Sequence, residues 1–379
     1  MWNYKMAQQA FPKISVVIPN YNHADCLRAA LASACYQEPQ PHEVLVFDDC
    51  STDNSVAVVE AFAKRFAFVQ CLRYPRKSIY WQKAWFDNVH LASGEWVLAL
   101  SADDLIYPGF IKAVGQMASQ YPQCGIVTAD VEIVSNKQGV MGLRRARFGK
   151  PCFLEGEQIR NQLRQFRASE CGSGTIIRKD ALLWLGKNNV TDMGPWCDSI
   201  GYPVVAMKHG ACYVPEVLGA VGFDDDKPTW SQKFMQDTPR ALETFDHVAK
   251  FLRSREVAAV VPVDVVLALE YKILVTLPPE CQTTLLPCLL RKHVQELISF
   301  GHVEHADQFL RGLLPLFPHH AQMHADWGLV QFRLGRIADA ETACRKALEL
   351  DPSITQAHAT LAQMQQQLGH AALESQPRL

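Results

Sequence analysis

Short apolar runs alternate with amphipathic stretches over the first hundred residues of the chain. The runs are rich in valine, isoleucine and leucine and are apolar on both faces, which is typical of strands in the middle of a covered sheet. The intervening stretches repeat their apolar positions at helical spacing, as at Leu27, Ala30 and Leu31. This order predicts a parallel sheet with helical crossovers. The predicted strands cover residues 13–18, 43–47, 68–72 and 96–100.

Polar side chains follow three of these runs, at the point where each strand is predicted to end. Asn22 follows the first run, Asp48 and Asp49 follow the second, and Asp103 and Asp104 follow the fourth. The carboxyl ends of parallel strands meet at one edge of the sheet, where ligands of open α/β folds bind. Carboxylates there suit Mg²⁺ or Mn²⁺ beside a diphosphate. The alternative for Asp103 and Asp104 is that they only start a turn and cap the next helix.

Composition and charge exclude several classes of protein. The 379 residues are enough for two domains, and the net charge of -2 argues against a nucleic-acid partner. The 12 cysteines form no CxxC pair, so we expect reduced thiols and no zinc site. The first ten residues lack the apolar core of a signal peptide, and charges interrupt the most apolar later stretch, 257–277. We therefore expect a cytoplasmic protein without a membrane span, or one placed peripherally at the inner membrane face.

Three segments occur in a specific order: Val-Val-Ile-Pro-Asn-Tyr-Asn at 16–22, the block 46–55, and Ala-Ser-Gly-Glu-Trp-Val-Leu at 92–98, ahead of the aspartate pair. Together they resemble the family 2 inverting glycosyltransferases of GT-A fold, over roughly residues 13–225. The resemblance implies an α/β fold with a Rossmann-like, mostly parallel sheet. It also implies a hexosyltransferase-type enzyme (EC 2.4) of bacterial polysaccharide biosynthesis or protein glycosylation. Such an enzyme moves a sugar from a nucleotide-diphosphate donor, expected to be a UDP-sugar, to a hydroxyl of a glycan or protein.

The resemblance also implies roles for particular residues. Asp49 matches the aspartate that contacts the nucleotide base. The family's acidic motif reads Asp-x-Asp-Asp, so Asp103 and Asp104 match the carboxylates that hold Mn²⁺ or Mg²⁺. Ser101 replaces the first carboxylate, which weakens the expected metal affinity. The residues expected to bind the nucleotide sugar are Pro19, Tyr21, Asn22, Asp48, Asp49, Asn88, Ser101 and Asp103.

Inverting transfer needs a carboxylate that takes the proton from the acceptor hydroxyl. The family places this base at a helix start after an acceptor-side segment, and Asp198 is the matching residue. Cys197 stands where the family usually has glutamate. A capping role for Asp198, with Asp192 as the base, is the alternative. The expected acceptor-side residues are Gly172, Ser173, Gly174 and Trp196.

A period of 34 residues marks the last part of the chain. Glycine recurs at 301, 335 and 369, proline at 318 and 352, and histidine at 324 and 358. This spacing resembles the tetratricopeptide repeat, in which small residues let paired helices cross closely and proline follows the second helix. Such a segment would bind a protein partner or acceptor, mediate self-association, or brace the rest of the chain. We thus predict a transferase domain over 1–235, a helical connector over 236–286 and repeats over 287–379.

The departures from the family pattern support a competing hypothesis. Ser101, Cys197 and the missing Asn-x-Gly between residues 77 and 90 are consistent with a decayed transferase fold that serves as a repeat scaffold. A nucleotidyltransferase, the third possibility, would need a glycine-rich phosphate loop after the first strand. Residues 19–22 contain no glycine. Nucleotide binding separates the enzyme from the scaffold.

Overall fold

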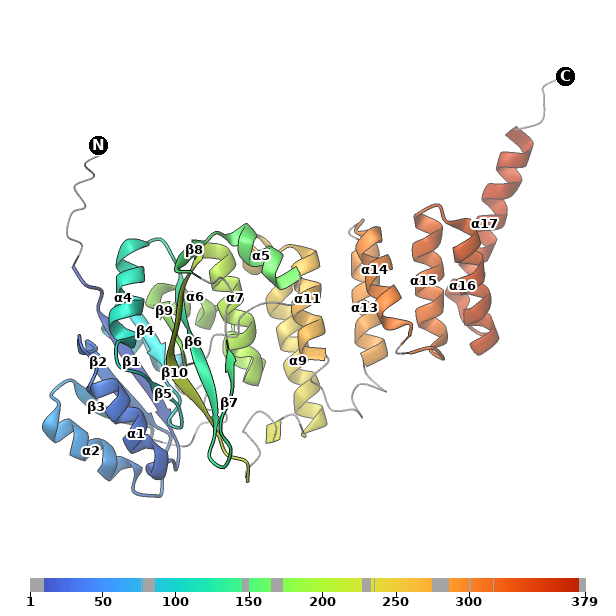
Figure 1. The fold of residues 1–379 in the computed structure, drawn as a ribbon. Helices are drawn as coiled ribbons and strands as arrows, with labels where there is room; N and C mark the ends of the chain where they lie inside the picture. Colours follow the sequence, from blue (N-terminus) through green and yellow to red (C-terminus); the bar gives the residue numbers. More distant parts are fainter. Residues whose placement is uncertain are drawn as a thin grey trace, which may run out of the picture. The chain divides into compact units, whose positions relative to one another are not determined.

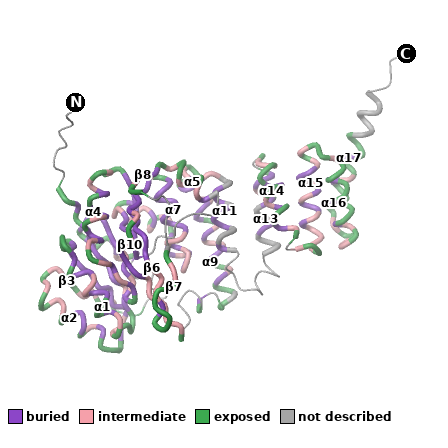
Figure 2. The backbone as a smooth tube through the Cα atoms, viewed as in Figure 1, coloured by how far each residue is buried: buried purple, intermediate pink, exposed green. Residues whose placement is uncertain are grey.

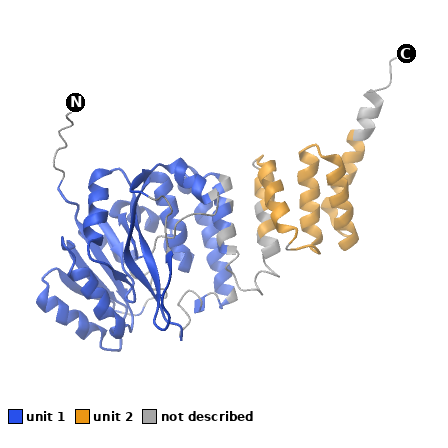
Figure 3. Ribbon diagram, viewed as in Figure 1, with its two compact units in different colours: residues 1–273 blue, residues 274–379 orange. Residues whose placement is uncertain are grey.

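The computed structural model describes residues 10–75, 77, 86–144, 150–164, 173–226, 233–234, 236–274, 286–299, 301–315 and 317–374. The chain forms two compact units, residues 1–273 and residues 274–379 (Figure 3). Helices between residues 238 and 273 therefore belong with the sheet that precedes them. The three-part division into transferase domain, connector and repeats stays a prediction.

A ten-stranded mixed sheet forms the centre of the first unit (Figure 1). The main strand order is β3-β2-β1-β4-β9-β6-β10-β5, with β7 beside β6 and β8 beside β10. The predicted α/β architecture is therefore present, although the sheet is parallel mainly in the half from β3 to β4. The strands are β1 (Ile14–Asn20), β2 (Glu43–Asp48), β3 (Val69–Arg73), β4 (Trp96–Ala99), β5 (Leu105–Ile106), β6 (Ile126–Ser135), β7 (Gly139–Arg144), β8 (Cys152–Leu154), β9 (Thr175–Arg178) and β10 (Ala211–Phe223).

The parallel half follows the hydrophobic pattern closely. Each of its strands begins within one residue of its predicted run. Val16, Val17 and Ile18 are fully buried, because helices cover both faces of these strands (Figure 2). The crossovers are α1 (Ala24–Cys35) and α2 (Ser55–Arg65), and α4 (Phe110–Gln120) follows the aspartate pair.

The second half of the sheet includes a hairpin, and three further helices lie between its strands in the sequence. These are α5 (Gly156–Arg164), α6 (Lys179–Lys187) and α7 (Cys197–His209), with β6 and β7 forming the hairpin. The acidic run 224–226 closes the hairpin turn: the Ser135 hydroxyl donates to Asp225, and Asn136 Nδ2 donates to Asp224 Oδ1 at 2.9 Å. These carboxylates therefore have a structural role in the turn.

Helices of the predicted connector pack on the end of the first unit. They are α9 (Thr238–Arg253), α10 (Arg255–Ala258) and α11 (Val263–Leu274). Helix α9 packs against the 3-10 segment η2 (Val190–Trp196), where His247 Nδ1 lies 3.1 Å from the Asp192 carbonyl oxygen. This contact joins α9 to the loop that leads to Asp198.

The second unit is a series of helices joined by short turns. They are α13 (Leu286–Ser299), α14 (Val303–Leu313), α15 (Ala321–Arg333), α16 (Ile337–Leu350) and α17 (Thr355–Glu374). Two contacts recur 34 residues apart: His324 Nε2 lies 3.0 Å from the Pro318 carbonyl, and His358 Nε2 lies 3.0 Å from that of Pro352. A Cβ at Gly328 would lie 2.4 Å from Cys344 Sγ, so α15 and α16 cross too closely for a side chain there. The repeated sequence therefore produces repeated local geometry.

Candidate active site

Two acidic loops flank the carboxyl end of the central strand β1. Strand β1 pairs in parallel with β2 on one side and with β4 on the other. Asp49 directly follows β2, and Asp103 follows β4 by a short turn. Neighbouring strands are about 4.8 Å apart, so the ends of β2 and β4 are separated by about 10 Å. Asp49 and Asp103 thus follow strands that lie on opposite sides of β1.

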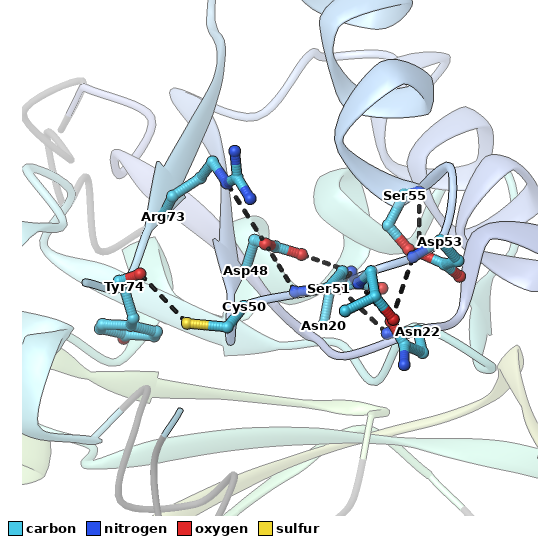
Figure 4. Close-up of polar contacts among 10 residues, drawn as sticks. Asn20, Asn22, Asp48, Cys50, Ser51, Asp53, Ser55, Arg73 and Tyr74 are labelled. Atoms are coloured by element: carbon cyan, nitrogen blue, oxygen red, sulfur yellow. Dashed lines mark hydrogen bonds and ion pairs between the residues drawn. The ribbon is translucent and has the colours of Figure 1, made fainter. Parts of the chain in front are cut away.

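The loop after β2 is fixed by a buried set of hydrogen bonds (Figure 4). Asn20 Nδ2 donates to Asp48 Oδ1 and to Ser51 Oγ, each at 3.0 Å, and the Ser51 N–H donates to Asp48 Oδ2 at 3.1 Å. Arg73 Nε lies 3.6 Å from the same Asp48 oxygen. Asp48 is 1% exposed, so its carboxylate holds the loop together. Asp49, the next residue, is also buried, with 5% of its surface exposed.

The loop after β1 presents Tyr21 at its surface. Asn22 adopts a positive φ of 54°, and its side-chain oxygen accepts the Thr52 N–H at 2.7 Å, so Asn22 ties this loop to the one after β2. Tyr21 is exposed, and the ammonium of Lys77 lies 3.6 Å from the centre of its ring. The positive charge beside an exposed aromatic ring suits a planar, negatively charged ligand.

Tyr74 and Asn88 lie near Asp49. Burial raises the pKa of the Tyr74 phenol, a hydrogen bond with the Asn88 side chain opposes this, and the Asp49 charge adds to the increase. The Cys50 thiol donates to the Tyr74 carbonyl at 3.3 Å. The predicted nucleotide residues Asp49 and Asn88 are therefore close to one another, through a tyrosine that sequence reasoning did not single out.

The two adjacent aspartates after β4 have different surroundings. Asp104 is 5% exposed; the Ser173 hydroxyl donates to its Oδ2, and the Gly222 N–H donates to its Oδ1 at 2.8 Å. Asp103 is exposed. Asp104 thus joins β4, β9 and β10, whereas Asp103 faces the solvent from which a ligand would approach.

This donor set fits a divalent metal held mainly by its substrate. Within the described residues, no three His, Cys, Asp or Glu side chains gather as a complete protein metal site. Mg²⁺ and Mn²⁺ bound beside phosphates need one or two protein carboxylates, because phosphate oxygens and water complete the coordination. Asp103 meets this requirement, while both Asp104 oxygens already accept hydrogen bonds.

We expect Asp104→Ala to unfold the first unit more easily, by about 2–4 kcal/mol, because the Ser173 hydroxyl and the Gly222 N–H lose their buried acceptor. Asp103→Ala, at the exposed neighbouring position, should change the free energy of unfolding by less than about 0.5 kcal/mol. Urea unfolding followed by tryptophan fluorescence measures both. Equal stabilities of the two variants would contradict the structural role of Asp104.

Asp198 lies at the first turn of α7 and is half-buried. Helix α7 has 13 residues, and β10 follows it directly after Gly210. The Ser199 N–H donates to Asp198 Oδ1 at 2.6 Å. The carboxylate thus accepts a backbone hydrogen bond at the start of its own helix.

The turn before Asp198 depends on a glycine and carries a buried indole. Gly194 has φ 52° and ψ −125°, and a Cβ there would lie 3.1 Å from the Phe234 ring. Trp196 follows it, and its indole N–H is buried without a hydrogen-bond partner in the described part of the chain. A buried donor of this kind is costly unless water or a ligand oxygen accepts from it.

The remaining predicted positions have different surroundings. Pro19 is half-buried at the end of β1, and Ser101 is half-buried after β4. Ser173 is buried against Asp104, and Gly174 lies where a Cβ would be 2.5 Å from Val131 Cγ1. Gly172 falls outside the described residues. Asn20, whose amide organises the loop after β2, was missed because nothing in the sequence distinguishes it from a turn residue.

A mixed α/β sheet with an acidic loop on each side of its first strand defines the GT-A type of nucleotide-sugar transferase fold. Residues 15–184, a little under half of the chain, match the family model described as Glycosyl transferase family 2. This match supports, over those residues, the resemblance seen in the sequence.

Known proteins are similar to this chain over different lengths. An undecaprenyl-phosphate 4-deoxy-4-formamido-L-arabinose transferase of Serratia proteamaculans is 32% identical over 122 residues, which is 31% of this chain and 37% of that protein. Crystal structures of S. aureus TarS 1-349, free and in complex with UDP-GlcNAc, are similar in fold, with TM-scores of 0.53 and 0.52 at 15% identity. The free structure matches over 90% of this chain and 93% of TarS 1-349, and the complex over 87% and 90%. The chain spans about a third of the length of the curated relatives that it matches.

No described helix combines the length and the apolar composition needed to cross a bilayer.

Proposed function

We propose that this protein is an inverting glycosyltransferase that takes a sugar from a UDP-sugar and transfers it to a hydroxyl of a glycan or protein. The observation that carries the proposal is the pair of acidic loops on either side of β1, with Asp49 buried and Asp103 exposed. The family 2 match supports the reaction class, and the UDP-GlcNAc complex of the similar TarS fold supports the donor class.

In this proposal the loops after β1 and β2 bind the nucleotide. Asp49 accepts hydrogen bonds from the base, and the Tyr21 ring with the Lys77 ammonium lies beside it. The Trp196 indole N–H donates to an oxygen of the donor or acceptor sugar. Binding by these groups holds the anomeric carbon near the start of α7, where proximity itself lowers the barrier to transfer.

Asp198 acts as the general base. Its carboxylate removes the proton of the acceptor hydroxyl while that oxygen attacks the anomeric carbon and the bond to the UDP phosphate oxygen breaks on the opposite face. The new glycosidic bond has inverted configuration, and UDP leaves with the bonding electrons. Asp103 would hold Mn²⁺ or Mg²⁺, which supplies positive charge to the departing diphosphate.

The second unit is proposed to be a short tetratricopeptide-like array that binds a protein partner. Its support is the pair of histidine–carbonyl contacts repeated after 34 residues and the close crossing at Gly328. A catalytically decayed scaffold is the second candidate function, because Ser101 and Cys197 replace family carboxylates. Burial and the adjacent Asp198 charge raise the pKa of the Cys197 thiol, so it stays neutral and supplies no charge in place of that carboxylate.

Calorimetry and a donor screen test the proposal. We expect UDP to bind in the presence of Mn²⁺, and we expect one UDP-sugar among UDP-, GDP- and TDP-sugars to be hydrolysed slowly without acceptor. Asp49→Ala should weaken UDP binding by about tenfold or more, which is the loss of one charge-assisted hydrogen bond to the base. Absence of nucleotide binding at millimolar concentration would favour the scaffold.

A further inference from the structure

Tyr74 is fixed by three contacts to the segment that carries Asp49. Its N–H donates to the Asp48 carbonyl at 3.0 Å, and its own carbonyl accepts from the Cys50 thiol at 3.3 Å (Figure 4). The centre of its ring lies 6.2 Å from the centre of the Phe47 ring. These three partners flank Asp49 in the sequence, so the end of β2 and its loop hold Tyr74 in place beside that carboxylate.

The Tyr74 phenol accepts from an amide and lies near a carboxylate. Burial raises the pKa of the phenol, a hydrogen bond from the Asn88 side chain lowers it, and the charges of Asp49 and Asp87 raise it further. A bond that favours the phenolate is one in which the Asn88 amide N–H donates to the phenol oxygen. The phenol stays protonated at neutral pH, so its O–H is a donor close to the Asp49 acceptor.

A donor close to an acceptor recognises one pattern on a pyrimidine base. Uracil has a donor at N3–H and an acceptor at O4, whereas cytosine has an acceptor at N3 and an amino donor at N4. Against Asp49 and Tyr74, uracil pairs donor with acceptor at both positions. Cytosine sets acceptor against acceptor and donor against donor. Asp49 is 5% exposed and Tyr74 is half-buried, so water compensates poorly for such mismatches.

The strand order places Tyr74 on the side of the base that carries O4. The four parallel strands run in the order β3-β2-β1-β4, and Tyr74 follows β3 while Asp103 follows β4, at opposite ends of this series. In the proposed function the diphosphate lies at Asp103, so the ribose, which is attached at N1, extends from the base towards β4. O4 is across the pyrimidine ring from N1 and therefore lies towards β3.

We propose that the Tyr74 hydroxyl donates a hydrogen bond to the O4 oxygen of uracil while Asp49 accepts from the N3–H, and that this donor makes the site select uridine over cytidine nucleotides. The proposal rests on the proposed role of Asp49 in binding the base. It assigns the choice of base to a residue outside the three segments that resemble the family. Asn88 is a positioning residue, because its amide fixes the phenol oxygen and leaves the O–H for the base.

Calorimetry with UDP and CDP on the full chain, in the presence of Mn²⁺, tests this proposal. We expect the wild type to bind UDP about 100-fold more tightly than CDP, and Tyr74→Phe only about tenfold, because phenylalanine keeps the ring and removes one of the two mismatched pairs. Tyr36→Phe is the matched control. It removes the hydroxyl of a tyrosine that is 54% exposed at the end of α1, and it should leave both affinities unchanged.

A modified nucleotide gives a second measurement on the unchanged protein. In 4-thio-UDP, sulfur replaces O4, and sulfur is the weaker hydrogen-bond acceptor. We expect the wild type to bind 4-thio-UDP about threefold or more less tightly than UDP, because the bond from the Tyr74 hydroxyl is weakened. Tyr74→Phe should bind the two nucleotides alike.

The ratio of the two affinities separates base selection from a role in holding the loop. If Tyr74→Phe weakens UDP and CDP by the same factor, or weakens neither, the proposal is overturned while UDP remains the donor nucleotide. Equal binding of UDP and 4-thio-UDP by the wild type would also overturn it, whatever the stability of the variant. If the wild type binds neither UDP nor CDP at millimolar concentration, the proposed function fails together with this proposal.

Discussion

Asp198→Asn is expected to lower the turnover of sugar transfer by at least about 10²-fold, because the amide cannot take the proton of the attacking hydroxyl. Affinity for UDP should stay nearly unchanged, since the role proposed for Asp198 is in the chemical step and not in binding the base. The two effects together are the signature of a group that acts on the reacting atoms. Steady-state transfer assays and calorimetry with UDP measure them on the same preparation.

Asp192→Asn is the matched control. Asp192 is half-buried in the same loop, and its backbone carbonyl contacts His247 of α9, an interaction that the substitution leaves in place. Wild-type turnover in this variant, with loss in Asp198→Asn, would distinguish the two candidate bases. The reverse result would identify Asp192 as the general base. Full activity in both variants would show that neither carboxylate of this loop acts as the general base.

Asp103→Ala is expected to weaken Mn²⁺-dependent UDP binding by about 10- to 100-fold, equivalent to about 1.4–2.8 kcal/mol, because Asp103 is the one exposed carboxylate of the acidic pair. Chelation of the metal with EDTA should have a similar effect on the wild type and little further effect on the variant. Calorimetry with and without Mn²⁺ gives all four affinities.

Asp339→Ala removes an exposed carboxylate of the second unit and serves as the control for Asp103→Ala. It should bind UDP and Mn²⁺ as the wild type does. If Asp103→Ala also binds normally, and EDTA has no effect on the wild type, the loops after β1 and β2 hold the nucleotide without a metal. The contribution of Asp103 would then be limited to shaping the turn after β4.

The sequence alone determined the order and type of the main elements in the parallel half of the sheet. Its strands are apolar on both faces and end in polar residues, and burial on both sides of a sheet requires this pattern. The same pattern placed Asp49 and Asp103 at one edge, because parallel neighbours share their carboxyl ends. The period of 34 likewise predicted helices of repeating geometry, which the His324 and His358 contacts display.

Only the tertiary structure showed which long-range contacts the members of each acidic pair make. Asp48 and Asp49, like Asp103 and Asp104, are adjacent and chemically identical in the sequence. The Asp48 carboxylate accepts hydrogen bonds from Asn20 and Ser51, and the Asp104 carboxylate accepts from Ser173 and Gly222. Ser51 lies across a turn from Asp48, and the other three partners lie 28 to 118 residues away in the sequence. Long-range hydrogen bonds of this kind leave no local pattern, since they depend on which strands become neighbours.

The antiparallel strands, the packing of α9 on the loop before Asp198 and the exposure of apolar residues on β7 were decided in the same way. The sequence around Val140, Met141 and Leu143 did not predict their exposure. Their exposure follows from the position of β7 at an open edge of the sheet, with β6 on one side and no described strand on the other. Hydrophobic periodicity determines which residues can be buried together. The number of neighbouring strands and helices that a strand acquires then decides which of those residues are buried.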